Sequence, residues 1–343
     1  MSPSIRFPEF TGEWEECKIE DITDAVSSGK SKNHFSNGEY NLYGSTGIIG
    51  RTDKALYDGK LVLVARVGAN AGFLQIINEP CGITDNTLIL KPKGIDAFYL
   101  YYFLQHFNLN RLIFGSGQPL ITGGMLKKVK VSLGTISEQS KIVKFLSLLD
   151  ERIAVQSRLI DRLQSLMIGI AQKIAHSNKP NVRISDCLEC SSSALQESEV
   201  NKTGKYPVYG ANGIVGYIDK YHTQNEAIYI IKDGSGVGGV SYVTGKCSST
   251  GTLNILQAKN GHSLKYLYYL LKVFNFVPYK TGMAIPHIYF KDYGKAKIFC
   301  PAYPEQLEYA KLLSSIDGNL RIALDSLKNI NLQKQYLLRH MLI

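Results

Sequence analysis

A chain of 343 residues exceeds the size at which a single hydrophobic core usually stops growing, so its length predicts about two domains. The composition, 44% hydrophobic and 20% charged, excludes disordered, collagen-like and membrane-embedded chains, and a formal net charge of +10 favours a polyanionic partner. Six cysteines without framework spacing are expected to be reduced thiols. With neither a signal-like N-terminus nor an apolar run of membrane length, we expect a cytoplasmic protein without membrane association.

The chain repeats itself with a period near 166 residues. Its landmarks recur in the same order at nearly constant offsets: Tyr40–Lys54 and Tyr206–Lys220, residues 98–104 and 265–271, Glu138-Gln139 and Glu305-Gln306. A shared period indicates two copies of one structural unit.

Within each copy, the first part predicts a mixed β-sheet with short helices. Short β-type runs at 61–65 and 87–90 recur at 227–231 and 252–256, separated by turns rich in Gly, Asn and Asp. A tyrosine-rich helix then follows at 98–107 and at 265–274, and its tyrosines are expected to be core residues. The fold class is therefore α+β.

The last part of each copy predicts a long helix. Apolar residues alternate at spacings of four and three, broken in the first copy by Gln156, which indicates a coiled-coil seam. The seam positions are Ile142, Leu146, Leu149, Ile153, Ile160, Leu163 and Met167, and then Leu313, Ile316, Leu320, Leu327, Ile330 and Leu337. We expect the two helices to pair as an antiparallel coiled coil, the alternative being that each lies along its own domain. The predicted segments are 1–136 and 177–304 for the globular parts and 137–176 and 305–343 for the helices.

The motifs of common enzymes are missing or incomplete. Gly234–Gly239 fits G-x-G-x-x-G, but a β-type run follows it where a dinucleotide site needs a helix. Asp53, Asp58 and Lys60 have no matching set in the second copy, as a metal-nuclease cluster would require. Cys187-x-x-Cys190 lacks the further ligand pair of a zinc site. The residues therefore predict neither a catalytic group nor a metal site. The function class that remains is recognition of a binding partner.

Five features together resemble the specificity (S) subunit of type I restriction-modification systems over essentially the whole chain. They are the opening Arg6-Phe-Pro-Glu-Phe-x-Gly-Glu-Trp14, the Tyr-Gly-x-x-Gly segments at 43–50 and 209–216, Ser137-Glu-Gln139, Pro304-Glu-Gln306, and the long helices. The resemblance implies that each globular half is a target recognition domain reading one half of an asymmetric, bipartite double-stranded DNA target. The paired helices would set the spacer and dock two methyltransferase (M) subunits, to which restriction (R) subunits add.

The same resemblance implies a non-catalytic chain without a cofactor of its own, since S-adenosylmethionine, ATP and Mg²⁺ belong to the partner subunits. Two alternatives stay open: the specificity subunit of a related type II system that cuts on both sides of its target, and a non-enzymatic coiled-coil scaffold.

DNA contacts are predicted at basic and polar loop residues, because such side chains reach phosphates and base edges. Arg66 and Lys232 occupy equivalent places before glycine-containing loops, and the loops at 115–122 and 280–287 share a glycine and a proline but differ elsewhere. The candidates in the first copy are Lys30, Lys32, Arg51, Lys54, Arg66, Asn70, Ser116, Gln118, Lys127 and Lys128. Those in the second copy are Asn212, Tyr217, Lys220, Lys232, Ser235, Lys280, Thr281, Met283 and His287.

The net charge is uneven between the copies. Residues 1–136 carry a net charge of +1, whereas residues 179–303 carry +6. The sequence therefore predicts that the second copy contributes more to salt-dependent DNA binding.

Overall fold

The computed structural model describes residues 3–32, 37–113, 119–176 and 179–343, and it divides the chain into two compact units. Unit 1 comprises Met1–Ser157 together with Ser326–Ile343, and unit 2 comprises Arg158–Asp325. Each unit is α+β, as the sequence predicted. Among the described residues, no helix combines the length and hydropathy needed to span a membrane.

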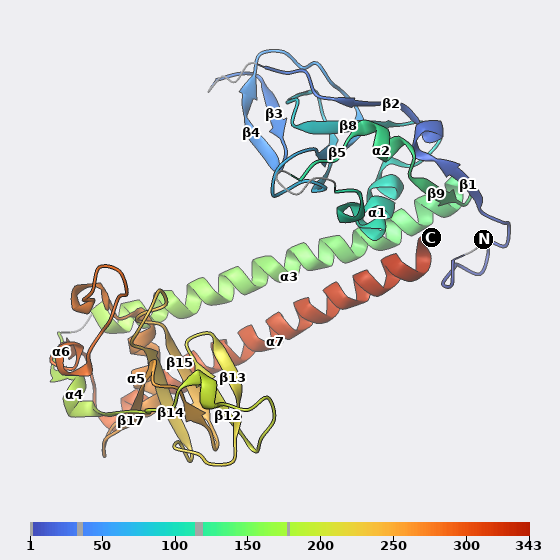
Figure 1. The fold of residues 1–343 in the computed structure, drawn as a ribbon. Coiled ribbons are helices and arrows are strands. Elements are labelled where there is room, and N and C mark those ends of the chain that lie inside the picture. The colour runs from blue at the N-terminus through green and yellow to red at the C-terminus, as the bar shows by residue number, and fades with distance from the viewer. Residues whose placement is uncertain (1–2, 33–36, 114–118, 177–178) are drawn as a thin grey trace. The chain divides into compact units, whose positions relative to one another are not determined.

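The described residues of unit 1 form three small sheets (Figure 1). The four-stranded antiparallel sheet has the order β2 (Thr23–Ser28), β8 (Thr87–Pro92), β5 (Lys60–Ala65), β6 (Leu74–Asn78). The three-stranded sheet has the order β4 (Gly47–Thr52), β3 (Tyr40–Gly44), β7 (Cys81–Ile83), with β3 and β7 parallel. The third sheet pairs β1 (Glu15–Lys18) with β9 (Lys130–Leu133).

Strand β5 shows why its sequence is apolar at nearly every position. Side chains alternate between the two faces of a strand, so a strand covered on both faces needs a continuous apolar run. Leu61 and Leu63 join a core cluster that includes residues of β7. Val62 and Val64 join the larger cluster, which includes helix α1 (Ala97–Phe107). The four-stranded sheet is thus the middle layer of unit 1.

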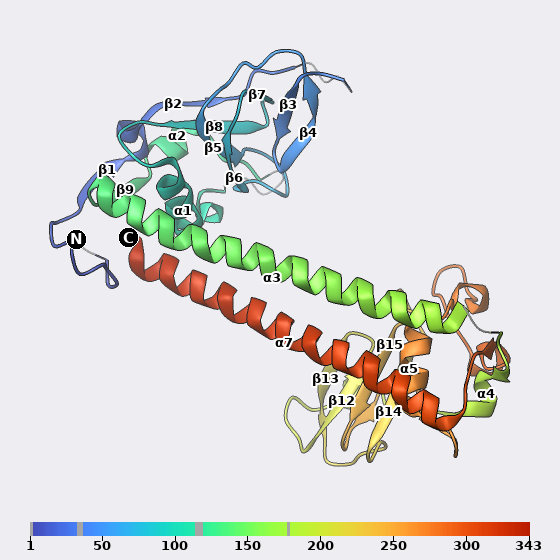
Figure 2. The same ribbon diagram turned by 180° about the vertical axis from the view of Figure 1, so that it is seen from behind.

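Unit 2 repeats this plan strand for strand. The four-stranded sheet has the order β11 (Leu188–Ser192), β17 (Leu253–Ala258), β14 (Glu226–Ile231), β15 (Val240–Thr244). The smaller sheets are β13 (Gly213–Ile218), β12 (Tyr206–Gly210), β16 (Ser248–Ser249), and the pair β10 (Val182–Arg183), β18 (Lys297–Ile298). Figure 2 shows helix α5 (Leu264–Val273) beside β14 and β15, and both strands contact it.

Short helices complete each unit. In unit 1 they are η1 (Ile19–Ile22), η2 (Leu109–Leu112) and α2 (Gly123–Lys127). In unit 2 they are α4 (Ile184–Cys187), η3 (Glu197–Glu199), η4 (Val277–Tyr279) and α6 (Phe290–Tyr293).

The duplicated Tyr-Gly-x-x-Gly motif forms a β-hairpin in each unit. The turn ends at Gly47 in unit 1 and at Gly213 in unit 2, with φ of 135° and 106°. These backbone angles favour glycine, because a Cβ atom is strained there. The motif that marks the repeat is therefore explained by turn geometry.

The tyrosine-rich helices pack into the cores, which confirms the expectation from the sequence. Tyr99 and Tyr102 of α1 are buried, as are the equivalent Tyr266 and Tyr269 of α5. The Tyr99 hydroxyl donates to the carbonyl of Ser132 at 3.0 Å, so its polar end is satisfied. These rings are not free to stack on bases.

Two long helices, α3 (Ile136–His176) and α7 (Tyr303–Met341), each contribute to both units. In unit 1, Ile142 and Leu146 of α3 share a core cluster with Leu338 and Met341 of α7. The next contact lies later in α3 but earlier in α7, because Lys334 Nζ lies 2.5 Å from a carboxylate oxygen of Asp150. The two helix segments in unit 1 are therefore antiparallel.

In unit 2, the other halves of these helices meet. Met167 and Ala171 of α3 line one groove together with Leu320 of α7. The seam residues named above are buried or half-buried at every position along both helices.

The Glu-Gln pairs at the helix starts have one shared and one distinct role. Gln139 accepts a hydrogen bond from the Asp96 amide (3.1 Å) and donates to the Gly134 carbonyl (2.9 Å). Gln306 makes the same two bonds in unit 2, accepting from the Ser263 amide and donating to the Pro301 carbonyl, each at 2.8 Å. The glutamine thus fastens the long helix to the start of the tyrosine-rich helix in both units.

Glu138 is buried and differs from its exposed counterpart Glu305. It receives two hydrogen bonds from the Arg6 guanidinium, at 2.6 and 2.8 Å, and one from the Trp14 indole at 3.1 Å. These bonds explain why Arg6 and Trp14 begin and end the N-terminal motif: both hold the N-terminal segment on α3.

Candidate nucleic-acid interface

In unit 1, several predicted contacts gather at one end of the four-stranded sheet. The Gly29 amide, after β2, donates to the Thr87 carbonyl at 3.0 Å. The Arg66 amide, after β5, donates to the Asn86 carbonyl at 2.9 Å. Lys30 and Arg66 therefore follow strands that end beside the same short loop.

Three exposed lysines in this region surround a shallow hollow. Lys30, Lys32 and Lys54 line it together with Thr52 and Asp53, and its volume is about 290 Å³. The ammonium groups outnumber the one carboxylate, so the hollow is locally cationic. This arrangement suits phosphate contacts, although the first copy has a net charge of only +1.

Arg51, near these lysines, is engaged within the protein. Its Nε donates to the Gly38 carbonyl at 2.6 Å, and its Nη2 donates to the Glu39 carbonyl at 2.8 Å. These bonds brace the chain that leads into β3. Arg51 is therefore placed to shape the loop, with part of its guanidinium already occupied.

A second loop runs beside the Arg66 loop. The Gly68 amide donates to the Pro119 carbonyl at 3.0 Å, and the Ile121 amide donates to the Arg66 carbonyl at 2.9 Å. Arg66 is half-buried, and its Nε has no hydrogen-bond partner among the described residues, whereas Asn70 is exposed. The predicted contacts Ser116 and Gln118 lie outside the residues that the structure describes.

Unit 2 joins the equivalent two loops by equivalent bonds. The Gly234 amide donates to the Pro286 carbonyl at 3.0 Å, and the Ile288 amide donates to the Lys232 carbonyl at 2.9 Å. Asp233 and His287 add a side-chain hydrogen bond of 2.6 Å. The two units therefore present different side chains on one shared loop frame.

Residues 281–287 form a small hairpin within this frame. Backbone hydrogen bonds of 2.8 and 2.7 Å join Thr281 and His287 at its base, and Met283 is fully exposed at its tip. Lys280 and Ser235 are also exposed. The predicted contacts Lys232, Ser235, Lys280, Thr281, Met283 and His287 therefore belong to one pair of adjoining loops.

Other candidates lie elsewhere. Lys127 and Lys128 belong to the α2 region at the opposite end of β2, where the Ile19 amide donates to the Val129 carbonyl. Tyr217 exchanges backbone hydrogen bonds with Asn201 at 2.8 and 3.1 Å, which gives it a role in the sheet edge. Lys220 is exposed beyond the end of β13, and Asn212 is exposed in the turn between β12 and β13.

A hollow also follows β11 in unit 2, but its lining is different. Ser191, Ser192 and Ser193 form one side, and Glu199 and His222 also line it. No lysine or arginine is among the described residues that line it, although residues 179–303 carry a net charge of +6. The first copy thus has the lower net charge but the more cationic hollow, and the second copy has the higher net charge but a hollow without basic residues.

The comparison with protein families agrees with the duplication. The family model described as "Type I restriction modification DNA specificity domain" matches twice, over residues 11–165 and 177–332. The chain belongs to this specificity family. Each matched segment contains one complete set of three sheets, from β1 to β9 and from β10 to β18, which confirms the resemblance seen in the sequence.

Two curated relatives of the specificity family are similar to parts of the chain. A putative type I restriction enzyme specificity subunit of Haemophilus influenzae is 25% identical over 35% of this chain and 32% of its own length. The EcoprrI specificity subunit of Escherichia coli is 28% identical over 32% of this chain and 28% of its own length. The aligned part therefore spans about a third of the length of either relative.

Solved structures from type I restriction-modification systems share the fold. The S subunit of a type I restriction-modification system from M. genitalium matches with a TM-score of 0.74 at 19% identity, covering 100% of this chain and 99% of that chain. A chain from a study of complex assembly and conformational transition of the type I R-M system matches with a TM-score of 0.56 at 12% identity. That match covers 96% of this chain and 97% of the other.

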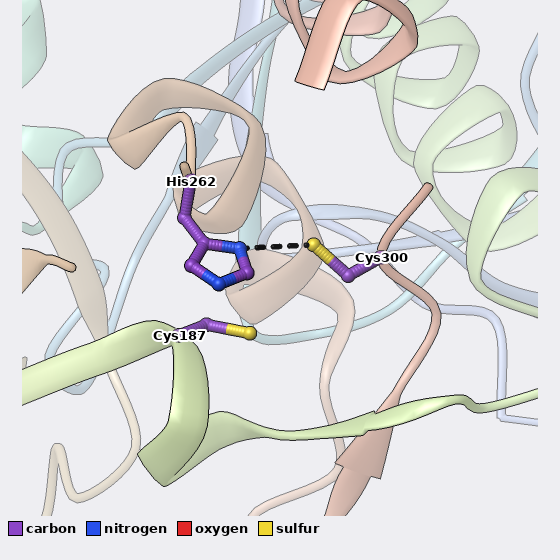
Figure 3. Close-up of side chains that lie close together, drawn as sticks. All are labelled: Cys187, His262 and Cys300. Atoms are coloured by element: carbon purple, nitrogen blue, oxygen red, sulfur yellow. Dashed lines mark hydrogen bonds between the residues drawn. The ribbon is translucent and has the colours of Figure 1, made fainter. Parts of the chain in front are cut away.

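The structure also brings together a group of residues that no sequence motif indicates. Cys187 does not meet Cys190 but lies with His262 and Cys300, and their ligand atoms are all within 4.8 Å of one another (Figure 3). The three residues are far apart in the chain, so no short spacing reveals them. Comparison of the two copies at these positions is the signal that could have found them.

Proposed function

We propose that this chain is the DNA sequence-recognition subunit of a type I restriction-modification complex, acting in the cytoplasm. The observation that carries the proposal is the duplicated DNA specificity domain. Each unit would bind one half of a bipartite target. Because the two loop pairs carry different polar residues, the half-sites would differ and the target would be asymmetric.

The proposed reading surface is the adjoining loop pair of each unit. Arg66 and Asn70 in unit 1 and Lys232 and Ser235 in unit 2 stand on loops with the same hydrogen-bonded frame. Base edges are read by such side chains, and phosphate contacts mainly position the protein. In this proposal, Lys30, Lys32 and Lys54 hold the backbone of the DNA while the loop pair reads bases.

The long helices offer equivalent apolar surfaces for two copies of one partner. Three pairs of large apolar residues are related by the repeat and are exposed in both units: Ile136 and Tyr303, Phe145 and Leu312, Val155 and Ile322. Exposed apolar residues at matching places suit protein contacts. We propose that each set docks one methyltransferase subunit, and that restriction subunits join the complex these form.

Catalysis would then belong to the partners. We propose that the methyltransferase and restriction subunits bind S-adenosylmethionine, ATP and Mg²⁺, and that this chain supplies recognition without a catalytic residue.

We propose further that the paired helices set the number of unspecified base pairs between the half-sites. One heptad adds about 10 Å to a helix, which is roughly three base pairs of B-DNA. Matched insertions after Val155 in α3 and after Ile322 in α7 would keep the two seams in register. The methylated target should then gain spacer without a change in either half-site, and an unchanged spacer would contradict this role.

Mapping methylated adenines in host DNA tests the proposal directly. Cells carrying the complete complex should show one bipartite motif. Arg66→Ala should relax only the half-site read by unit 1, and Lys232→Ala only the other, because each base contact contributes about 1–3 kcal/mol of discrimination. Asp24→Ala, on the opposite end of β2, is the matched control. If both variants left both half-sites unchanged, the loop pairs would not be the reading surface.

A further inference from the structure

Three residues that could ligate a metal converge in unit 2 from separate segments. Cys187 ends α4, His262 directly precedes Ser263, the N-cap of α5, and Cys300 follows β18. The Cys300 Sγ lies 3.4 Å from Nδ1 of His262 (Figure 3). Ligand atoms around a tetrahedral zinc ion are separated by roughly 3.5–3.8 Å, given its bond lengths to sulfur and nitrogen. The group therefore needs only small movements to hold an ion.

The equivalent positions of unit 1 contain no metal-binding side chains and serve as a comparison. The flanking hydrogen bonds align the copies: Asp21 and Asp186 each accept from a backbone amide three residues earlier, and Gln139 and Gln306 make the matching bonds described above. The residues equivalent to Cys187, His262 and Cys300 are then Ile22, Ile95 and Leu133, at offsets of 165, 167 and 167.

In unit 1, these three equivalents are ordinary core residues. Ile22 and Ile95 are buried in the larger core cluster, and Leu133 packs against it. Unit 2 replaces all three by side chains that bind soft divalent cations. Cysteine alone can serve as a small apolar residue, but a histidine between two cysteines does not suit an apolar core. The joint replacement of three residues that meet in space indicates one shared role.

The surrounding hydrogen bonds hold each ligand in place. Asn181 brackets Cys300, accepting from its amide and donating to its carbonyl at 2.8 Å each. The Lys259 amide donates to the Cys187 carbonyl at 2.9 Å, and the His262 amide donates to the Lys259 carbonyl at 3.1 Å. Such outer contacts orient ligands and support metal affinity.

The two thiols also differ in pKa. A hydrogen bond from the Cys187 thiol, together with the neighbouring His262, lowers the pKa of Cys300 to about 6. The same hydrogen bond, together with burial, raises the pKa of Cys187, so this thiol would release its proton when the ion binds.

We propose that Cys187, His262 and Cys300 form a binding site for a zinc-class divalent cation, with water as the fourth ligand. Two sulfurs and one imidazole select zinc over magnesium or calcium, which prefer oxygen ligands. The ion would cross-link α4, the start of α5 and the segment that leads into α7. This inference replaces the expectation that the chain holds no metal, and it does not depend on the proposed DNA target.

Metal analysis of the full-length chain tests the proposal. The protein is purified without a histidine tag under reducing conditions, its metal content is measured by mass spectrometry, and the metal-free form is titrated with Zn²⁺ and Co²⁺. We expect one equivalent of zinc, and a cobalt form with thiolate-to-metal charge-transfer absorption. Cys187→Ser and Cys300→Ser should each weaken zinc binding by more than about 100-fold, since even outer contacts contribute about 10–100-fold. Cys190→Ser should leave zinc binding unchanged.

A triple variant separates loss of the metal from loss of the fold. Cys187→Ile with His262→Ile and Cys300→Leu installs the residues that unit 1 uses, so unit 2 should stay folded by circular dichroism while zinc binding disappears. Zinc should raise the Tm of the wild-type chain and not that of the triple variant. The proposal is overturned if the wild type binds zinc no more tightly than the triple variant. It is equally overturned if Cys187 and Cys300 form a disulfide and the reduced protein then binds no zinc.

Discussion

Units 1 and 2 share the same arrangement of strands and helices, but equivalent positions make different side-chain interactions. At the start of the long helix, unit 1 buries Glu138 under Arg6 and Trp14, whereas the equivalent Glu305 of unit 2 is exposed and accepts a hydrogen bond from Tyr309. Along the helix seam, Lys334 bonds to Asp150 in unit 1, and the residue equivalent to Lys334 in unit 2 is Met167.

The differences have a common pattern. Backbone hydrogen bonds and sheet order are kept between the units, while the side chains that fill the frame change. Duplication therefore preserves what positions the loops and leaves the loop side chains free to differ. This division of roles is what the proposed reading of two unlike half-sites requires.

The largest expected effect tests whether the helix seam is equally important in both units. Leu146 and Leu313 are equivalent and fully buried, with 0% exposure. Leu146→Ala and Leu313→Ala should each lower the free energy of unfolding by about 2–5 kcal/mol, through the cavity each creates. Hydrogen exchange measured by mass spectrometry should locate the first effect in unit 1 and the second in unit 2. A cost below 1 kcal/mol at either site would show that the seams are unequal.

A second prediction concerns the paired apolar surfaces. Val155→Glu and Ile322→Glu place a charge at equivalent positions that are 56% and 69% exposed. Each should weaken one of two methyltransferase contacts by about 2 kcal/mol or more, the size of an interface hot spot. Native mass spectrometry should show the bound partner falling from two copies to one for each variant. Retention of two copies by both variants would contradict the proposed docking surfaces, and Lys328→Glu is a control on an exposed residue of α7.

The glutamates at the helix starts should respond unequally. Glu138→Ala leaves the buried Trp14 indole N–H without its acceptor, which costs about 1–3 kcal/mol. Glu305→Ala changes an exposed residue and should stay within about 0.5 kcal/mol. Thermal unfolding of both variants measures the difference. Equal costs would mean that the N-terminal segment does not stabilise unit 1 through Glu138.

The salt dependence of DNA binding tests whether the net charge of a unit or its local cluster of lysines determines how much that unit contributes to phosphate binding. The net charge of +6 in residues 179–303 predicts the larger contribution from unit 2, while the lysine-lined hollow predicts it from unit 1. We expect Lys30→Ala with Lys32→Ala and Lys54→Ala to reduce the slope of log K against log salt by about 1 per lysine. The matched variant, Lys220→Ala with Lys232→Ala and Lys280→Ala, should reduce it less. The reverse order would assign the main phosphate contacts to unit 2.

The smallest effect is a pH dependence confined to unit 1. Hydrogen bonds from Asn41 (2.8 Å) and Tyr43 (2.5 Å) lower the pKa of Glu79, and the equivalent position in unit 2 is Gly245. A lowered pKa means that this stabilisation is present above the ordinary glutamate pKa and is lost as pH falls through the lower value in the folded state. We expect less than about 1 kcal/mol, because Glu79 is near solvent.

Hydrogen exchange in residues 40–52 at decreasing pH checks this expectation. After correction for the intrinsic pH dependence of amide exchange, protection should fall in the wild type and change little with pH in Glu79→Gln. An equal fall in the variant would assign the pH dependence to other groups.

Much of the frame is predictable from the sequence, for physical reasons. The repeat exposes the two copies, the four-three spacing from Ile142 marks the helix seam, and the tyrosine-rich runs indicate core helices. These signals can be read from the sequence because core packing requires apolar residues at regular local spacings. The pairing of Arg66 with Lys232 likewise follows from their equivalent places in the repeat.

Contacts between distant segments were beyond the same reasoning. The bond between Arg6 and Glu138 spans 132 residues, and the bond between Asp150 and Lys334 spans 184. Cys300 and His262 are 38 residues apart, with no spacing motif to connect them. The engagement of Arg51 with backbone carbonyls also has no sequence signal, because only the path of the chain around residues 38–39 creates it.

The discontinuity of unit 1 has a consequence for the order of folding during synthesis. Unit 2 is continuous from Arg158 to Asp325, whereas the core of unit 1 includes Leu338, Met341 and Leu342. The ribosome therefore releases nearly all of unit 1 first, but that unit waits for the last turns of α7 to complete its core. The domain made first is thus completed last, because its core needs a helix that is made after the second domain.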